Sequence, residues 1–512
     1  MLANPAFWQH HLSVYFLGID CSHGQTRVTA LDLESASLKA EATSPHHYLT
    51  DRPEGHVEQD PSVWIQAIDS AVRACLEQLG ADRSRIAGIG VTAFANGIVM
   101  LDAENRILRP AKVGDDVSAG RQSEEISRAF GGAPGMIELG SNRCRATDAA
   151  ARILWVKQSE PQIYQQTESI LMPHDFINYW LTGIKLTEPG EASTTGLFDV
   201  VNRSWRKEIL EVIDSGLEAK LPPVRSSREP HGQLRAELAE AWGVSPRVLV
   251  SAGSGEAMCE ALGSGAVKTG VTILKFGEDA QLSVVSEQPL VDSRTEVQGR
   301  CDAVDRWLPT VRIRNAMSAI DMVCRHYQID FTAMEQHAAT APAGSAGLNF
   351  LPYFTGESTP HFPEASAVLH GLNFNNFTVA HICRAAMEGV ALSIAYGLNR
   401  LRELGVETDL IRITGRGASS PLLRQMLADA CDAPIVALKS GGSAALGAAL
   451  QAAVTFIRQS GETLSYEELA NYLVLTDGET LAQPQEAARA VYEHTMSQQQ
   501  YLADSLQGSG FL

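Results

Sequence analysis

The strongest constraint on the fold is a strand–turn–strand pattern that occurs twice, about 250 residues apart. Residues 14–33 form an apolar run, a polar turn and a second β-rich run, and residues 271–285 repeat this arrangement. Two short apolar strands around a polar turn predict a β-hairpin. Two such hairpins favour a duplicated domain, although two unrelated α/β domains would also fit.

Helical periodicity follows each hairpin. Apolar residues spaced three and four apart predict helices over residues 61–79 and 381–404. Short apolar strands over residues 86–91, 248–251 and 411–414 alternate with such helices, which favours a layered α/β fold. A length of 512 residues suits two or more domains.

Charge and cysteine usage exclude several function classes. With 41 basic and 60 acidic residues, the net charge is −19, which argues against nucleic acid and against anionic membranes as partners. The eight cysteines are scattered without a CxxC pair, so we expect buried, reduced thiols. The N-terminus lacks a basic region with a cleavage site, and no apolar run has transmembrane length, so we expect a cytoplasmic protein.

Residues 351–388 contain the most specific motif of the chain. The spaced positions are Ala367, Leu369, Gly371 and Leu372, followed after eight residues by His381, Ile382, Ala385, Ala386, Met387 and Glu388. This pattern resembles a signature of the FGGY carbohydrate kinases. Further segments look like that family, most closely its xylulokinases, and together they extend over residues 16–453: 55–64, 99–112, 172–183, 195–200, 260–270 and 444–453.

The resemblance implies an architecture and a set of ligands. It implies two actin-like, ribonuclease-H-like ATPase domains with a cleft between them. We predict that residues 1–250 form the sugar-side domain, and residues 251–512 the nucleotide-side domain with a helical segment from Ser465 onward. ATP and Mg²⁺ are the implied cofactors, a small sugar is the implied partner, and a homodimer is left open.

The implied general base lies in the segment Gly253 to Ala257. Where the family has Gly-Asp-Asn, this chain has Gly255, Glu256 and Ala257. The resemblance therefore implies Glu256 as the base, with Ala257 beside the sugar. Glutamate moves the carboxylate oxygens by more than about 1 Å relative to aspartate, and an uncompensated shift on that scale can cost on the order of 10²-fold in rate. Without the resemblance, Glu256 would be an acid at a helix start.

Two further predicted sugar contacts depart from the family pattern. Phe94-Ala95-Asn96-Gly97 occupies the place of Gln-Met-His-Gly, so Asn96 and Gly97 become the expected contacts. Asp116 aligns with a sugar-binding aspartate, although a plain surface acid would also fit. Gly114 aligns with a tryptophan, and its small size is expected to leave room for a larger ligand.

The two hairpin turns are the predicted phosphate loops. The first reads Asp20-Cys21-Ser22-His23-Gly24-Gln25, where the family has Asp-x-Gly-Thr-x-Ser. The resemblance implies Asp20 as the acid linked to Mg²⁺, and a turn-capping carboxylate is the alternative. The second reads Gly277-Glu278-Asp279-Ala280 in place of Gly-Thr-Ser-Gly. Its acids are expected to repel phosphate, by roughly 4 kcal/mol per charge pair at 4 Å, unless they recruit Mg²⁺ or face solvent.

The implied adenosine loop spans residues 415–420. Gly415, Arg416, Gly417 and Ser419 are its predicted nucleotide contacts, and Arg416 replaces a glycine of the family pattern. Its side chain must point away from the base, or stack on adenine or pair with phosphate. The sequence thus predicts an ATP-dependent carbohydrate kinase, similar to xylulokinases, that acts on a ketose or polyol. The alternative is a catalytically impaired relative that binds sugar or regulates.

Overall fold

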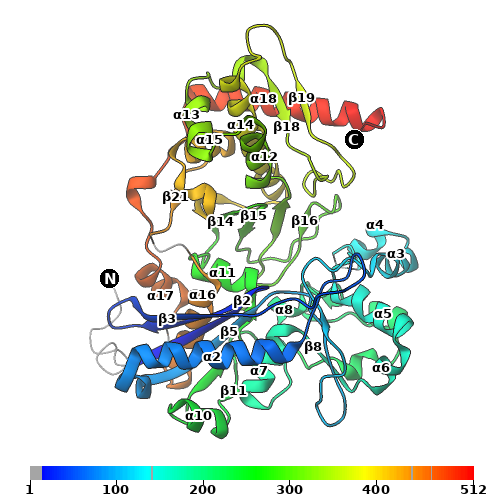
Figure 1. Cartoon of the computed structure of the whole chain (residues 1–512), viewed down its shortest axis with the longest axis vertical. Coiled ribbons are helices and arrows are strands. Elements are labelled where there is room, and N and C mark those ends of the chain that lie inside the picture. Colours follow the sequence, from blue (N-terminus) through cyan, green and yellow to red (C-terminus); the bar gives the residue numbers. More distant parts are fainter. Residues whose placement is uncertain (1–13, 140–141, 440–441, 463, 512) are drawn as a thin grey trace.

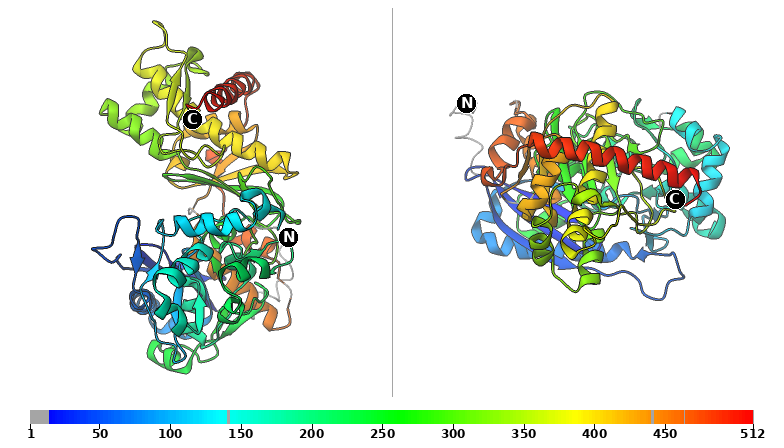
Figure 2. Two further views of the ribbon diagram at one scale, coloured as in Figure 1. Left: turned by 90° about the vertical axis from the view of Figure 1, so that its right-hand side faces the viewer. Right: turned by 90° about the horizontal axis from the view of Figure 1, so that it is seen from above.

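Two large β-sheets form the centres of two lobes (Figures 1 and 2). The computed structural model describes residues 14–139, 142–439, 442–462 and 464–511. The first sheet has the order β11-β12-β5-β1-β2-β3, with β13 paired to β5, and the second has the order β16-β17-β15-β14-β20-β21. Their strands are β1 (Tyr15–Cys21), β2 (Gln25–Asp32), β3 (Ser37–Pro45), β5 (Ile86–Ala93), β11 (Pro230–Gln233), β12 (Leu249–Ser251), β13 (Ser254–Gly255), β14 (Gly270–Phe276), β15 (Ala280–Val284), β16 (Val297–Gln298), β17 (Thr310–Ile313), β20 (Thr408–Thr414) and β21 (Ile435–Ala437).

The two sheets share one core topology. In the first, β1 is antiparallel to β2 and parallel to β5, and β5 is parallel to β12. In the second, β14 is antiparallel to β15 and parallel to β20, and β20 is parallel to β21. Both predicted hairpins are therefore confirmed, as is the predicted α/β fold of two actin-like domains.

Helices cover the outer faces of both sheets and fill the space between them (Figure 1). The predicted helix over 61–79 is confirmed by α2, whose N-terminus is capped by Asp60, and the one over 381–404 by α14. The helices are α2 (Pro61–Leu79), α3 (Gly120–Ala129), α4 (Ala133–Glu138), α5 (Ala149–Ser159), α6 (Pro161–Gln166), α7 (Pro173–Thr182), α8 (Pro189–Ala192), α9 (Lys207–Ile213), α10 (Ala236–Trp242), α11 (Glu256–Gly263), α12 (Met317–Tyr327), α13 (Phe331–Ala339), α14 (Val379–Glu403), α15 (Pro421–Cys431), α16 (Ala444–Gln459), α17 (Tyr466–Leu473) and α18 (Glu486–Gly508). The last two make the C-terminal segment largely helical, as predicted.

Each lobe has its own apolar core, and a third core joins them. Helices α2, α7 and α10 pack on one face of the first sheet, and α12, α14 and α15 pack on one face of the second. Between the sheets, α11, α16 and α17 share a core with side chains of β1 and β14. The two lobes are therefore joined through buried apolar contacts on one side.

Helix α16 comes from the second half of the chain but rests directly on the first sheet. A Cβ atom on Gly18 of β1 would lie 1.8 Å from the carbonyl oxygen of Ala445, and one on Gly90 of β5 would lie 2.0 Å from that of Ala448. Side chains at these two glycines would push the helix off the sheet. The division between residues 250 and 251 stays a prediction.

The remaining expectations concern thiols and membranes. All eight cysteines are buried and free, which confirms that the thiols are buried, as predicted. Within the described ranges, no helix has both the length and the apolar character needed to cross a membrane.

Candidate active site

A cavity of about 350 Å³ between the two sheets collects part of the predicted site. It brings together Asn96, Glu256 and Ala257 from the predicted sugar side. From the second predicted phosphate turn, Asp279 reaches the same cavity. The lining also includes residues that the sequence analysis missed, namely Asp115, Arg145, Thr147, Glu260, Lys275, Gln281, Gln298, Arg300, Thr310 and Arg312.

Glu256 is the first residue of α11, and the loop before it is anchored by a buried glutamine. The side-chain oxygen of Gln451 on α16 accepts hydrogen bonds from the Gly253 N–H at 2.6 Å and the Ser251 hydroxyl at 2.9 Å. Its amide nitrogen donates to the carbonyls of Gly253 and Ala303. A fully bonded buried amide fixes a backbone firmly, so Gln451 positions Glu256. A polar residue in the alanine-rich first part of α16 is its only sequence signal.

Lys275 contacts Glu256 directly, whereas Asp20, which does not line the cavity, lies close enough for the charge of Glu256 to act on it. Lys275 Nζ lies 3.4 Å from Glu256 Oε1 and 2.7 Å from Glu260 Oε2. Burial lowers the pKa of Lys275, but the two carboxylates outweigh it and hold the pKa above its ordinary value. Burial and the charge of Glu256 raise the pKa of Asp20 to about 7, against a weaker effect of the hydrogen bond from Ser22.

Asn96 lines the cavity and has an unused acceptor. Its backbone has a positive φ of 65°, and its side-chain oxygen is buried without a partner among the described residues. Buried polar atoms are rarely left unpaired, so this oxygen suits a ligand hydroxyl. Gly97 instead lies against Pro173, since a Cβ there would approach its ring to 2.5 Å.

The structure separates the two neighbouring aspartates of the first lobe. Asp116 is fully buried and accepts hydrogen bonds from Val57 N at 2.8 Å, Lys112 Nζ at 3.3 Å and the Ser118 hydroxyl at 2.5 Å. Its carboxylate is thus occupied by hydrogen bonds within the protein, and its role in sugar binding stays a prediction. Asp115 is exposed and lines the cavity.

Arg152 holds the two loops that carry Asn96 and Asp115. Its guanidinium donates to the carbonyls of Asn96 at 2.8 Å and Gly114 at 2.6 Å, and more weakly to those of Lys112 and Asp116. Burial lowers its pKa to about 10. One fully buried cation therefore ties the walls of the sugar side together.

His23 fills the space beside Gly114. Its ring stacks on Phe94 with centroids 4.6 Å apart, and a Cβ on Gly114 would lie 3.3 Å from the ring. Burial lowers the pKa of His23, which favours its neutral form. The room expected from the missing tryptophan is thus partly occupied by the bulkier residue of the first turn.

The second phosphate turn is less repulsive than its sequence indicates. The N–H of Gly277 donates to the Asp279 carbonyl at 2.9 Å, and the Asp279 carboxylate pairs with Arg312 at 2.6 Å. Glu278 is exposed, and its carbonyl accepts from the N–H groups of Ala316 and Ser318, at the start of α12. One of the two acids is therefore neutralised by a cation.

The predicted adenosine loop touches the second phosphate turn through Phe276. A Cβ on Gly415 would lie 2.6 Å from the Phe276 carbonyl oxygen, and one on Gly417 would lie 2.2 Å from its ring. Arg416 points away to form an ion pair with Asp321 of α12. Ser419 donates to the Arg416 carbonyl at 2.9 Å. The two glycines thus allow the close approach of two nucleotide-side loops.

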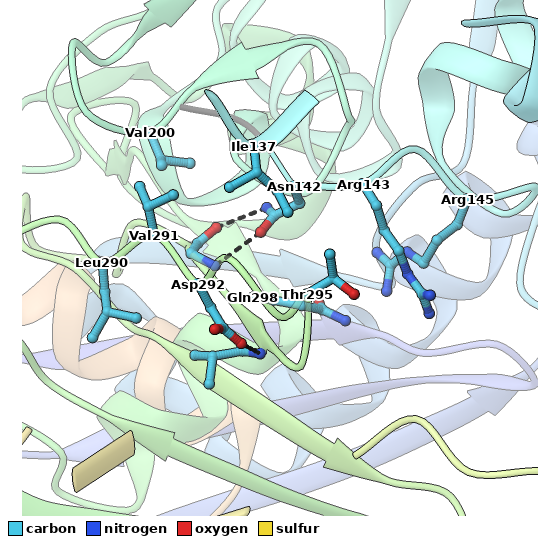
Figure 3. A pocket seen from close by; sticks show the side chains of 12 residues that line it. Ile137, Asn142, Arg143, Arg145, Val200, Leu290, Val291, Asp292, Thr295 and Gln298 are labelled. Atoms are coloured by element: carbon cyan, nitrogen blue, oxygen red, sulfur yellow. Dashed lines mark hydrogen bonds between the residues drawn. The ribbon is translucent and has the colours of Figure 1, made fainter. Parts of the chain in front are cut away.

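Two residues that line a smaller pocket, which shares Arg145 and Gln298 with the active-site cavity, clasp the lobes together (Figure 3). The Asn142 side chain donates to the Gly299 carbonyl and accepts from the Gly299 N–H, both at 2.9 Å. Beside it, an Arg143 nitrogen lies 2.8 Å from His361 Nε2. Asn142 and Arg143 belong to the first half of the chain, and Gly299 and His361 to the second. Together these two contacts form the clasp.

Asn142→Ala is expected to weaken the clasp and open the cleft. Loss of two hydrogen bonds removes about 1–2 kcal/mol from the closed form, which raises KM about tenfold with little change in kcat. Steady-state kinetics and small-angle X-ray scattering measure both effects. The exposed Asn375 supplies the control, Asn375→Ala. An unchanged KM together with an unchanged radius of gyration would contradict a closing role.

An unpaired carboxylate lies beneath the loop that carries Glu256. Both oxygens of Glu191 are buried without a hydrogen-bond partner among the described residues. A Cβ on Gly255 would lie 2.9 Å from Glu191 Oε2. Burial raises the pKa of Glu191 well above its ordinary value, an effect that His174 opposes and that Asp175 and Glu188 strengthen. The folded protein therefore favours the protonated form of Glu191.

Glu191→Gln is expected to stabilise the protein increasingly as pH rises. The raised pKa contributes stability that is complete below pH 4.5, the ordinary value, and that is lost as pH rises toward the folded value. In this range the parent protein loses about 1.4 kcal/mol per pH unit from this group, and the glutamine variant does not. Melting temperatures from pH 5 to 8 test this, with Glu237→Gln on exposed α10 as control. A difference between parent and variant that stays constant with pH would contradict the protonated state.

Both halves of the chain match models of one family. Residues 15–263 match the N-terminal domain, and residues 284–456 the C-terminal domain, of the FGGY family of carbohydrate kinases. A xylulose kinase of Haemophilus influenzae is 32% identical over 443 residues, which cover 85% of this chain and 90% of that protein. One from Escherichia coli is 29% identical over 422 residues, or 81% of this chain and 84% of that protein.

Solved structures agree with this assignment. The structure of a xylulose kinase from Brucella ovis has a TM-score of 0.89 and 26% identity, and covers 96% of this chain and 99% of that one. A gluconate kinase from Lactobacillus acidophilus has a TM-score of 0.88 at 19% identity, over 96% of this chain and 98% of that one, and shows the fold alone. The chain belongs to the FGGY family of carbohydrate kinases, enzymes that transfer phosphate from ATP to an alcohol of a carbohydrate.

Proposed function

We propose that the protein phosphorylates a ketose or polyol with Glu256 as general base. The observation that carries this proposal is the shared cavity of Glu256, Asn96 and Asp279. It joins a carboxylate, an unused hydroxyl acceptor and the second phosphate turn in one space. The xylulose kinase relatives support a ketose as the first substrate to examine.

Each residue has a role that its contacts support. Glu256 takes the proton of the attacking hydroxyl, while Lys275 holds the carboxylate in place from 3.4 Å. Asn96 accepts a hydrogen bond from a second hydroxyl, and Ala257 lines the wall beside it. Positioning of this kind is the main protein contribution to phosphoryl transfer. ATP supplies the phosphoryl group, and we assign its contacts to Gly277, Glu278, Gly415, Arg416, Gly417 and Ser419.

The residues present fit Mg²⁺ bound mainly through phosphate. No cluster of three or more His, Cys, Asp or Glu side chains suited to a metal occurs in the described part of the chain. Mg²⁺ usually takes one or two carboxylates together with water and phosphate oxygens. Asp20 would hold the ion directly or through water. It lies near the end of β1, close enough for the charge of Glu256 to raise its pKa. The ion would neutralise developing negative charge.

A binding assay and a turnover assay together test the function. Calorimetry with Mg·ATP measures nucleotide binding, and a coupled assay of ADP release measures turnover with xylulose, ribulose, xylitol and ribitol. We expect micromolar to millimolar nucleotide affinity and turnover of at least one sugar. Nucleotide binding without transfer to any ketose or polyol would contradict the proposed reaction. Light scattering tests the homodimer, and the cytoplasmic location stays a prediction.

A further inference from the structure

Arg300 lies in the wall of the active-site cavity without a carboxylate partner. It follows β16, is half-buried, and donates a hydrogen bond to the Gln298 side chain. No acid of the described residues comes within ion-pair distance of it, and Asp148 acts on its charge only from farther away. A partly buried cation without a partner is costly unless an anion completes its environment.

Two more guanidinium groups line the same cavity, but their charges are already balanced. Arg145, from the first half of the chain, pairs with Asp148 at 2.9 Å, and Arg312 pairs with Asp279 at 2.6 Å. Burial, then Arg145 and Arg312, lower the pKa of Arg300 to about 9. The three cations therefore repel one another, and Arg300 is the one whose charge is not balanced by a carboxylate.

Other residues of the lining offer acceptors. Asn96 has an unpaired side-chain oxygen, and Asp115 and Glu256 contribute carboxylates. Lys275, the cation nearest to Glu256, is engaged by Glu256 and Glu260. The cavity thus combines acceptors that suit hydroxyl groups with one unpaired cation that suits a negative charge.

We propose that the substrate is a polyol whose far end carries an anionic group, a carboxylate or a phosphate. The anion is bound by Arg300, with Gln298 and Arg145 beside it, while the hydroxyl groups face Asn96 and Glu256. A planar guanidinium can bind such a group through two parallel hydrogen bonds. The proposal rests on the proposed function, because it names the substrate class of the same site.

The nucleotide is the competing source of an anion for Arg300. The phosphate turn lies at Gly277–Asp279, and its nearest arginine is Arg312, which contacts Asp279 directly. Among the charged groups, Arg145 and Asp148 of the first half of the chain, which is the predicted sugar side, act most strongly on Arg300, and Arg145 lines the same cavity. This placement favours the sugar over the transferring phosphate, and the experiment separates the two.

Matched ligand pairs test the proposal by calorimetry without nucleotide. The probes are gluconate with glucitol, xylonate with xylitol, and glucitol 6-phosphate as the phosphate arm. Arg300→Gln removes the charge but keeps hydrogen-bonding ability. Arg314→Gln is the control, because Arg314 follows β17 but does not line the cavity. ADP release with each ligand is measured in parallel for all three proteins.

The expected result is a preference for the anion that depends on Arg300. At least one anionic probe should bind about tenfold to a hundredfold more tightly than its neutral partner. Arg300→Gln should abolish this preference and Arg314→Gln should keep it, and the phosphate arm shows which anion is favoured. Equal or tighter binding of the neutral polyols, or no binding of any anionic probe at millimolar concentration, overturns the proposal.

Nucleotide measurements distinguish this proposal from the proposed function. If Arg300→Gln weakens Mg·ATP binding and lowers turnover of neutral and anionic sugars equally, Arg300 serves the phosphoryl group and the proposal is wrong. If a neutral ketose is phosphorylated and the anions are ignored, the kinase reaction stands and only the anion site fails. If an anion binds through Arg300 but is never phosphorylated, the site stands and the proposed reaction fails.

Discussion

Glu256→Gln is expected to lower kcat by about 10²- to 10⁴-fold while leaving sugar and nucleotide affinity within a fewfold of the parent. Glutamine keeps the shape of the side chain and its contact with Lys275, but it cannot take the hydroxyl proton. Because α11 and its preceding loop are held by Gln451, the fold should be unaffected. Single-turnover measurements of phosphate transfer, with calorimetry for each ligand, separate chemistry from binding.

Two companion variants sharpen this experiment. Glu237→Gln, on the exposed surface of α10, changes the same charge away from the cavity and should have parental kcat. Glu256→Asp shortens the side chain by one methylene, and its kcat shows whether the loop positions a glutamate better than an aspartate. If the Glu256→Gln enzyme has nearly the same kcat as the parent, Glu256 is not the general base.

Arg152→Leu is expected to lower the free energy of unfolding by about 3–5 kcal/mol, the cost of breaking a buried polar network by removing one partner. The guanidinium is fully buried and serves four backbone carbonyls, which leucine would leave unpaired. The melting temperature of the first lobe should fall by about 10 °C. Differential scanning calorimetry measures this loss.

Arg152→Lys and Arg128→Leu serve as the comparison variants for this loss. Lysine reaches fewer carbonyls, so it should recover part of the stability, whereas a change at Arg128, which is 80% exposed, should cost little. The folded Arg152→Lys protein should also bind sugar more weakly, because the loops that carry Asn96 and Asp115 are no longer both held by one guanidinium group. Equal stability of Arg152→Leu and Arg128→Leu would show that the carbonyls find other partners.

The elements of the fold were predictable because their signals are local. Alternating apolar residues around polar turns identify the β1–β2 and β14–β15 hairpins, and regular helical spacing identifies α2 to the residue. Short or partly exposed strands, such as β16 and β3, have weaker patterns and were missed. The packing of α16 on the first sheet depends on Gly18 and Gly90, which are distant in sequence and give no local signal.

The residues of the candidate site were predictable only where the residue type and its place in the motif allowed a single role. Glu256 and Asn96 meet in the cavity as expected. Asp115 and Asp116 are adjacent, and the direction of each side chain depends on partners such as Val57 and Lys112, which no spacing rule supplies. Arg300 was missed because an unpaired cation is recognisable only after the positions of all nearby acids are known.

The place of α16 also sets the order in which this chain can mature on the ribosome. The face of β1 and β5 that α16 covers is complete only after residue 459 has been synthesised, more than 350 residues after the end of β5. Until then, the nascent first sheet exposes an apolar surface, a condition that favours aggregation and chaperone binding. We therefore expect a ribosome-bound fragment ending before α16 to be captured by chaperones and cleaved readily by protease, and a fragment that includes α16 to resist both.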